Sequence, residues 1–336
     1  MRLATYRHAG VQRAGVVLGD AGDEVVRALA PGASVLGVAS LDREGAAAAA
    51  SWALSSSPAV PLSDVRLLPP VRPTSIRDFV AFEEHVEGVV RSVSGGTGVP
   101  AEWYTAPAFY FGNPHSVVGA RDDVEIPPGC EVFDFELEIA AVVGEHGRDL
   151  DPERARDHIV GYTILNDWSA RDLQAVEMKV GLGPAKGKDS ASTLGPWLVT
   201  PDELEPYRDG DGYLALEMRS WLNGTAVGRD LSSNASWTFE EMLAHASRGS
   251  WVAAGDVLGS GTCGNGGCLA ELWGLAGSRD PRPLAAGDVV RLEVEGLGAV
   301  ENRVVRRPIG APGRPVRPAR TRDRLRSRSG SDSVWV

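Results

Sequence analysis

Apolar and acidic residues alternate strictly along the segment 133–139, Phe-Asp-Phe-Glu-Leu-Glu-Ile. A period of two predicts a β-strand, with the apolar side chains on one face and Asp134, Glu136 and Glu138 on the other. The strand continues into four apolar residues at 140–143, so it enters a core. Carboxylates there repel one another, and burial without a partner would neutralise them. The acids therefore either face solvent or bind a divalent cation such as Mg²⁺, Ca²⁺ or Mn²⁺ through oxygen ligands.

Elsewhere the hydrophobic periodicity predicts mainly strands and only a few helices. The expected strands are 2–6, 14–18, 65–68, 107–113, 160–165, 213–222, 255–262, 269–273, 287–295 and 298–305. The expected helices are 41–54, 77–87, 152–159 and 238–246. Asn223-Gly224 predicts a type I′ hairpin turn, and Thr238 with Glu241 forms a capping box at a helix start. Together these elements favour a mainly-β or α+β fold over a doubly wound one.

A second polar stretch, 166–174, reads Asn-Asp-Trp-Ser-Ala-Arg-Asp-Leu-Gln. Ser169, with an acid three residues later, is the expected N-cap of a helix. Arg171 and Gln174 would then project from one face of that helix. Asp167 lies between the end of the preceding strand and the start of the helix, and side chains at such junctions often converge on pockets.

The segment 77–87 has the phase of a helix with His85 on one side and Asp78 two turns earlier. Both side chains would then face one cleft. A lone histidine on such a helix is more often structural than catalytic, so both interpretations stay open at this point.

Other polar residues have roles that the pattern alone leaves open. Tyr110 would face away from Phe109 and Phe111, which are expected to pack in the core, and it could line a pocket. Lys188 ends a glycine-rich loop that lacks the Walker spacing of a phosphate-binding loop. Glu271 is an isolated acid in an apolar segment predicted as a strand.

Composition narrows the class of protein. With 336 residues, 43% of them hydrophobic, the chain can form one large domain or two modest ones around a sizeable core. The net charge of −11 argues against a nucleic-acid-binding protein. Three cysteines suggest no disulfide framework, which favours a reducing cytoplasm. We find no signal peptide and no apolar run of membrane-spanning length, so neither secretion nor a membrane is expected.

The chain divides into three parts by composition. Residues 1–68 read as a small β-rich N-terminal domain, and a proline-marked linker introduces the larger part, 69–307. From 308 to 336, arginine, proline and glycine are dense and hydrophobic residues are few. This basic tail is expected to be disordered, and a solvated appendage is favoured over contact with nucleic acid or an acidic partner.

Five motifs together, spread over 65–306, resemble the fumarylacetoacetate hydrolase family. They are Asp78-Phe79 through His85, the acidic strand 133–138, the stretch 166–174, Gly187-Lys188, and Ser260-Gly261-Thr262 through Glu271. Within the family, the chain resembles bacterial acylpyruvate hydrolase and 2-hydroxyhepta-2,4-diene-1,7-dioate isomerase-like members. The resemblance implies a mixed β-sandwich roll as the catalytic domain, a small leading domain, and a homodimer.

The resemblance also implies roles for individual residues. The expected metal ligands, usually for Mg²⁺ or Ca²⁺, are Asp78, Glu136, Glu138 and Asp167. The expected catalytic residues are His85 as general base, Glu271 as its orienting acid, and Arg171, Gln174 and Lys188 as groups that hold the substrate's oxygens and the developing carbanion. The expected substrate-pocket positions are Tyr110 and Thr262. Asp134 matches no ligand position, and Cys263 and Cys268 match no role.

The implied activity is metal-dependent hydrolysis of the carbon–carbon bond of a 1,3-diketo acid of the fumarylacetoacetate or acylpyruvate type. Other relatives are decarboxylases, hydratases or tautomerases of 2-keto acids, and in many of these a glutamate follows the histidine by three residues. Here that position is Gly88, which together with Glu271 favours the hydrolase. Val80 and Ala81 replace polar and aromatic residues of fumarylacetoacetate hydrolase, so the substrate stays open. The alternative outside the enzymes is a protein that binds a metal or another ligand without catalysing a reaction.

Overall fold

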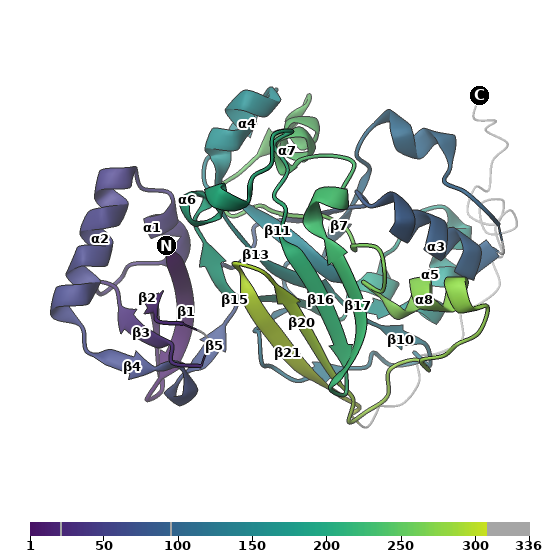
Figure 1. The fold of residues 1–336 in the computed structure, drawn as a ribbon, viewed down its shortest axis with the longest axis horizontal. Helices are drawn as coiled ribbons and strands as arrows, with labels where there is room; N and C mark the ends of the chain where they lie inside the picture. Colours follow the sequence, from purple (N-terminus) through teal and green to yellow (C-terminus); the bar gives the residue numbers. More distant parts are fainter. Residues whose placement is uncertain (21, 95, 308–336) are drawn as a thin grey trace, which may run out of the picture. The chain divides into compact units, whose positions relative to one another are not determined.

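The computed structural model describes residues 1–20, 22–94 and 96–307, and its main element is a long mixed sheet (Figure 1). The strands of this sheet follow the order β4-β3-β2-β1-β15-β13-β11-β19-β6-β7, with β5 and β8 attached to β1 and β15. Its N-terminal members are β1 (Arg2–His8), β2 (Val11–Leu18), β3 (Val25–Ala28), β4 (Ala59–Pro61) and β5 (Arg66–Leu68). The others are β6 (Ile76–Phe79), β7 (Phe109–Gly112), β8 (Val117–Val118), β11 (Leu137–Val143), β13 (Ile159–Asp167), β15 (Ser192–Val199) and β19 (Val257–Gly259).

A second sheet of five strands packs on the first, with the order β17-β16-β20-β21-β9. Its strands are β9 (Val124–Glu125), β16 (Glu217–Leu222), β17 (Thr225–Leu231), β20 (Val289–Val294) and β21 (Gly298–Val305). Asn223 and Gly224 both have positive φ between β16 and β17, as the predicted type I′ turn requires. Two small ribbons complete the sheets, β10 (Phe133–Asp134) with β14 (Ser169–Ala170), and β12 (Gly147–Arg148) with β18 (Trp251–Val252).

Eight α-helices lie around these sheets within the described residues. They are α1 (Val35–Ala39), α2 (Arg43–Ser56), α3 (Glu83–Ser94), α4 (Pro152–His158), α5 (Arg171–Glu177), α6 (Pro201–Leu204), α7 (Phe239–Ser247) and α8 (Leu269–Ala276). The predicted capping box of Thr238 and Glu241 is confirmed at the start of α7. Every residue of β11 is buried, with β13 and β19 along its two edges and β16 of the second sheet packed against it. The predicted mainly-β, α+β class is confirmed.

Two elements that carry site residues differ from the prediction. The segment 77–87 is not one helix: β6 ends at Phe79, and α3 begins at Glu83. Hydrogen bonding of β6 to β19 and β7 overrides the local helical phase. The predicted strand 269–273 is wrong as well, because these residues form α8 and pack against α3.

Three smaller expectations also need correction. The acidic strand is interrupted after Asp134, so its two halves belong to different sheets. Ser169 does not cap α5, since the helix follows Ala170 without a side-chain cap and the Ser169 hydroxyl donates to the Asp167 carbonyl. Phe111 is 65% exposed rather than packed in the core.

Some expectations are not tested by this part of the chain. The basic tail 308–336 lies outside the described residues, and the homodimer concerns a second chain. The division after residue 68 also stays a prediction, although β1 pairs with β15 and residues 1–306 form one compact unit. None of the helices in the described ranges has the length and apolar character needed to cross a bilayer.

Candidate metal and acid–base site

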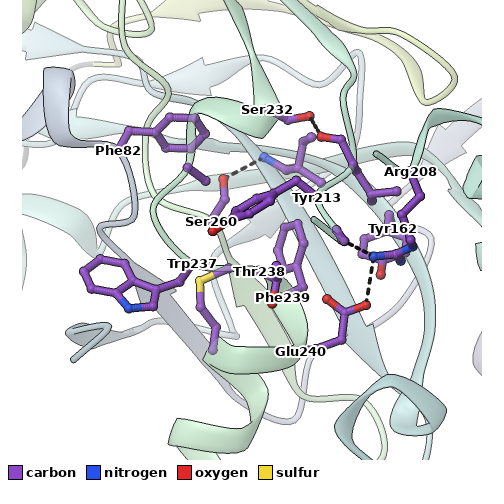
Figure 2. A pocket seen from close by; sticks show the side chains of 15 residues that line it. Phe82, Tyr162, Arg208, Tyr213, Ser232, Trp237, Thr238, Phe239, Glu240 and Ser260 are labelled. Carbon is purple, nitrogen blue, oxygen red and sulfur yellow. Dashed lines mark hydrogen bonds and ion pairs between the residues drawn. The ribbon is translucent and has the colours of Figure 1, made fainter. Parts of the chain in front are cut away.

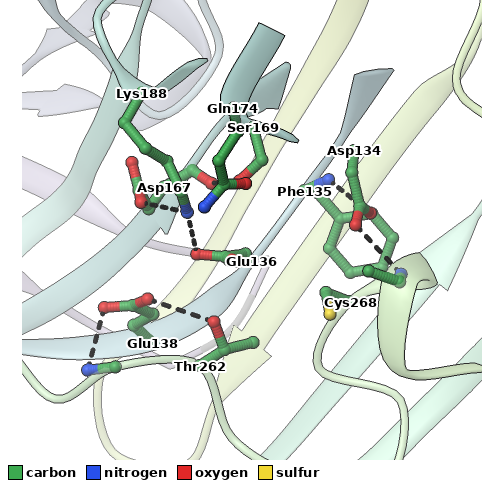
Figure 3. A network of polar contacts seen from close by, with 12 residues as sticks. Asp134, Phe135, Glu136, Glu138, Asp167, Ser169, Gln174, Lys188, Thr262 and Cys268 are labelled. Atoms are coloured by element: carbon green, nitrogen blue, oxygen red, sulfur yellow. Dashed lines mark hydrogen bonds and ion pairs between the residues drawn. The ribbon is translucent and has the colours of Figure 1, made fainter. Parts of the chain in front are cut away.

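Four carboxylates from distant parts of the sequence converge in the main sheet. Asp78 comes from β6, Glu138 from β11, Asp167 from the end of β13, and Glu136 from the link between β10 and β11. All four are buried, and one oxygen of each lies within 4.8 Å of one oxygen of every other. Figure 3 shows three of them, Glu136, Glu138 and Asp167, turned towards one space. The predicted metal-binding acids are therefore brought together by the pairing of β6, β19, β11 and β13.

Gly259 in β19 leaves room for this cluster. A Cβ at this position would lie 2.3 Å from Asp78 Oδ1 and 2.8 Å from Glu138 Oε2. Any other residue would thus displace two of the four acids. The backbone approach that only glycine allows is part of how the sheet holds the carboxylates.

A buried lysine, a partly buried arginine and a tyrosine lie against these acids. Lys188 donates to Asp167 Oδ2 over 2.6 Å and also pairs with Glu136. Tyr110 donates to the same oxygen of Asp167 over 2.5 Å. Arg171 Nη2 lies 2.7 Å from Glu136 Oε1. Burial acts to raise the pKa of Glu136, but the charges of Lys188 and Arg171 outweigh it and hold that pKa well below its usual range.

The other three acids are pushed in the opposite direction. Burial, followed by the charge of Asp78, raises the pKa of Glu138 well above its usual range. Burial also raises the pKa of Asp78, and it raises that of Asp167 to about 8 despite the nearby Lys188. Without a cation, protons must therefore offset part of the negative charge of the cluster.

The donor set fits a hard divalent cation. Asp78 Oδ1 is buried and meets no hydrogen-bond donor among the described residues. A buried carboxylate oxygen without a partner is costly unless an ion binds it. Asp78, Glu136, Glu138 and Asp167 would supply oxygen ligands only, which is the preference of Mg²⁺, Ca²⁺ and Mn²⁺.

The affinity for Mg²⁺ is expected to rise between pH 6 and pH 8.5. The pKa of Asp167 is raised to about 8, and the pKa values of Asp78 and Glu138 are raised as well, so protons compete with the ion for these acids and fewer have to be displaced as the pH rises. Calorimetric titration at a series of pH values would measure the affinity and the protons released. Equal affinities at pH 6 and 8.5, with no proton release, would contradict this assignment.

A histidine and a glutamate lie beside the carboxylates. His85 from α3 and Glu271 from α8 are both buried, and Nδ1 of the histidine lies 3.8 Å from Oε2 of the glutamate. This distance is too long for a hydrogen bond, so the two groups are adjacent without being bonded. His85 also has a ring nitrogen within 4.8 Å of a Glu136 oxygen. The pair therefore adjoins the metal cluster.

Close packing of α3 on α8 places this pair. Gly88, one turn after His85, lies directly under Glu271, and a Cβ at 88 would be 2.5 Å from Glu271 Cγ. Positions 88 and 271 therefore cannot both carry an acidic side chain in this packing. Glu271 occupies the space because Gly88 has no side chain.

The remaining predicted residues also border the cluster. Thr262 donates to Glu138 over 3.4 Å, and Arg171 donates to Gln174 over 3.3 Å. The residues predicted as ligands, as catalytic groups and as pocket positions are thus in one neighbourhood, although their roles stay proposals. Gly261 N–H also donates to Glu138, a contact that no side-chain pattern signals.

Asp134 and Cys268 have structural contacts that the sequence did not indicate. Asp134 accepts hydrogen bonds from the first two N–H groups of α8, at Leu269 and Ala270, and from Arg171. Asp134 thereby orients α8, which carries Glu271, and the guanidinium of Arg171. These contacts give Asp134 a structural role although it is not among the proposed metal ligands. Cys268 Sγ lies 3.7 Å from His85 Nδ1.

Figure 2 shows a separate pocket, lined among others by Tyr162, Trp237 and Phe239. It contacts Ile139, whose side chain points away from that of its neighbour Glu138. Aromatic residues surround it, and the ion pair of Arg208 and Glu240, 3.1 Å apart, lines one side. This pocket contains none of the predicted site residues.

The comparison with protein-family models decides the family. The model described as fumarylacetoacetate (FAA) hydrolase C-terminal matches residues 74–305. The chain belongs to the fumarylacetoacetate hydrolase family. The match covers every candidate residue of the site, from Asp78 to Glu271.

Relatives within the fumarylacetoacetate hydrolase family carry different activities in their names. A fumarylacetoacetase of Arabidopsis thaliana is 32% identical over 257 residues, which are 63% of this chain and 61% of that protein. A mitochondrial oxaloacetate tautomerase of Xenopus laevis is 35% identical over 191 residues, 56% of this chain and 55% of that protein. The chain thus matches less than two thirds of the length of either relative.

Solved structures of the family share the fold along most of the chain. A fumarylacetoacetate hydrolase of Exiguobacterium antarcticum is 26% identical, with a TM-score of 0.69, over 91% of this chain and all of that one. A 5-carboxymethyl-2-hydroxymuconate delta-isomerase of Mycobacterium smegmatis is also 26% identical, with a TM-score of 0.66 and the same coverage. The fold prediction is confirmed, and the chain is a member of a family of hydrolases and isomerases.

Proposed function

We propose that this protein is a divalent-metal-dependent hydrolase that cleaves the carbon–carbon bond of a 1,3-diketo acid of the fumarylacetoacetate or acylpyruvate type. The observation that carries the proposal is the His85–Glu271 pair beside four buried carboxylates, with Gly88 leaving room for Glu271. Relatives with glutamate at the position of Gly88 are expected to favour other 2-keto acid reactions. Here the packing of α3 on α8 leaves no room for a glutamate at position 88 beside Glu271.

The side chains suit hydrolysis of such a bond. His85 would take a proton from water, so that the oxygen can attack the substrate carbonyl. Glu271 would stabilise the charged imidazolium and fix the orientation of the ring. The proton on His85 then passes to the carbon of the departing enolate, and the products are a carboxylic acid and a ketone.

The enolate that departs needs positive charge and hydrogen-bond donors. Lys188 and Arg171 lie beside Glu136 and would hold the oxygens of the substrate, with Gln174 next to Arg171. A cation held by Asp78 and the other three acids, proposed as Mg²⁺ or alternatively Mn²⁺ or Ca²⁺, would polarise the ketone as a Lewis acid. These groups also provide local attraction for an anionic keto acid in a protein with a net charge of −11.

A substrate panel tests the proposal. The purified protein, supplied with Mg²⁺ or Mn²⁺, should cleave fumarylpyruvate, fumarylacetoacetate or a simpler acylpyruvate, followed by loss of the diketone absorbance and by product analysis. Decarboxylation of oxaloacetate is measured in parallel. Activity on oxaloacetate alone would overturn the proposal that the protein hydrolyses a diketo acid.

A 2-keto acid tautomerase, isomerase, decarboxylase or hydratase on the same site is the second candidate. It is favoured by the 35% identity to a protein named oxaloacetate tautomerase. Tautomerisation would need the proton transfer by His85 but no attack by water. The panel separates the two, because a tautomerase changes the keto–enol ratio of oxaloacetate without cleaving a diketo acid. A silent binding protein would show no turnover in either assay.

Replacing Gly88 with alanine is expected to lower kcat at least about tenfold with little change in metal affinity. The new methyl group would displace Glu271, which contributes to catalysis only through His85. Steady-state kinetics and Mg²⁺ titration measure the two effects. Gly210→Ala is the matched control, because a Cβ there meets no atom within 4 Å. An unchanged kcat in Gly88→Ala would contradict the proposal that Glu271 assists His85 in catalysis.

Ending the chain after Arg307 is expected to leave turnover and Mg²⁺ affinity unchanged. Every proposed site residue lies between Asp78 and Glu271, and the family match ends at residue 305. The same assays on the full chain and on residues 1–307 would show this. A loss of more than half of kcat/KM in the shortened protein would mean that the basic tail contributes to activity.

A further inference from the structure

Glu136 belongs to a second group of possible metal ligands. Its partners there are His85 and Cys268, and one ligand atom of each residue lies within 4.8 Å of the others. All three side chains are buried. The proposed reaction uses His85 and Glu136 but gives Cys268 nothing to do, so the thiol at this place calls for a separate explanation.

The spacing of sulfur and nitrogen fits a tetrahedral ion. Cys268 Sγ lies 3.7 Å from His85 Nδ1. Zinc binds sulfur at about 2.3 Å and imidazole nitrogen at about 2.0 Å, so the two atoms of a tetrahedral site are about 3.5 Å apart. A set of one sulfur, one nitrogen and one oxygen suits Zn²⁺ and similar thiophilic cations, whereas Mg²⁺ and Ca²⁺ prefer oxygen alone.

A second observation points to a ligand at this place. Oε2 of Glu271 is buried, accepts no hydrogen bond from any described residue, and lies 3.8 Å from the same ring nitrogen of His85. A water molecule on an ion bound by His85 and Cys268 can donate to this oxygen. Such a water is the usual fourth ligand where a protein provides three.

The surroundings hold the thiol in place and allow Glu136 to turn. The N–H of Glu271 donates to Cys268 Sγ over 3.4 Å at the start of α8, and this contact fixes the position of the sulfur. Arg171, which now pairs with Glu136, keeps Asp134 at 2.8 Å if Glu136 turns to the ion. Arg171 and Lys188 therefore each keep one acidic partner, Asp134 and Asp167.

We propose that His85, Glu136 and Cys268 bind a thiophilic divalent cation of the Zn²⁺ type, and that this ion inhibits the enzyme by withdrawing His85 from proton transfer. The proposal that this ion binds rests on the ligand geometry alone. The proposal that it inhibits the enzyme rests on the proposed function, since it assumes that His85 is the base.

Cobalt provides a direct test, because thiolate-bound Co²⁺ has a charge-transfer absorption in the near ultraviolet that carboxylate-bound Co²⁺ lacks. The full-length protein is titrated with Co²⁺ in excess Mg²⁺, beside Cys268→Ser, Cys268→Ala and the control Cys263→Ser. Cys263 is a buried cysteine outside both ligand groups. The band should form in the wild type and in Cys263→Ser, disappear on addition of Zn²⁺, and be absent from both Cys268 variants.

The inhibition is then measured with the substrate found in the panel. Zn²⁺ should inhibit the wild type and Cys263→Ser reversibly on chelation, and at least tenfold more Zn²⁺ should be needed for Cys268→Ser. A wild type without the cobalt band, or a Cys268 variant that keeps it, would overturn the site. Equal Zn²⁺ sensitivity of wild type and Cys268→Ser would overturn the inhibition. If no substrate is turned over, the proposed function fails while the cobalt band still decides the site.

Discussion

Replacing His85 with glutamine is expected to lower kcat/KM by about 10²–10⁴-fold, the usual contribution of a general base. Glutamine keeps most of the volume and a polar end group but cannot accept a proton from water. Metal affinity should change little, because the proposed hard-cation ligands are carboxylates that the variant retains. Steady-state kinetics with the diketo acid and calorimetric titration with Mg²⁺ measure the two quantities separately.

The control for this variant is Glu84→Gln, which introduces the same amide one residue earlier on α3, at an exposed position. It should keep full activity. If His85→Gln keeps the kcat/KM of the wild type, His85 is not the base. The silent binding protein or a different proton acceptor would then be the better interpretation.

Replacing Glu136 with alanine is expected to reduce Mg²⁺ affinity at least about 100-fold and to abolish turnover. The variant loses a proposed ligand and also the shared partner of Lys188 and Arg171. Losing one member of a buried ion pair typically lowers the free energy of unfolding by about 3–5 kcal/mol, so a lower melting temperature should accompany the loss. Calorimetric titration and thermal unfolding with and without Mg²⁺ test both effects.

Glu131→Ala removes an exposed carboxylate from the same part of the chain and serves as the control. It should bind Mg²⁺ as the wild type does. Full metal occupancy in Glu136→Ala would refute the assignment of Glu136 as a ligand. A variant that is less stable but still binds Mg²⁺ would mean that Glu136 serves only the two cations.

The sequence indicated which polar residues converge better than it indicated the elements that carry them. The acids of 133–139 alternate, and this local pattern indicated a strand that enters the core, which holds for β11 from Leu137 onward but not across the break after Asp134. Asp78 was expected on a helix and lies on β6, a strand of four residues held by pairing with β19 and β7. That pairing joins residues far apart in the sequence, which no local periodicity records.

Glu271 shows a different limit. The run 269–273 is short and apolar, and periodicity cannot separate a short buried strand from a buried helix. Its position as the acid beside His85 came from the family motif, which fixes the order of residues and not their conformation. Cys268 and Asp134 gave no such signal, because their contacts with His85 and α8 exist only after α3 and α8 have packed.

The pairing of β1 with β15 has a consequence for how the protein can be divided. Arg2 and Leu3 pair with Val199 and Leu198 on the flank of β15, whose other neighbour β13 ends in Asp167. A fragment that began at residue 69 would leave the end of β15 at Leu198 and Val199 with open N–H and C=O groups, while β8 still pairs with the start of the strand. Such a bare edge readily joins the same edge of another molecule, so the leading segment also guards the enzyme against self-association through its sheet.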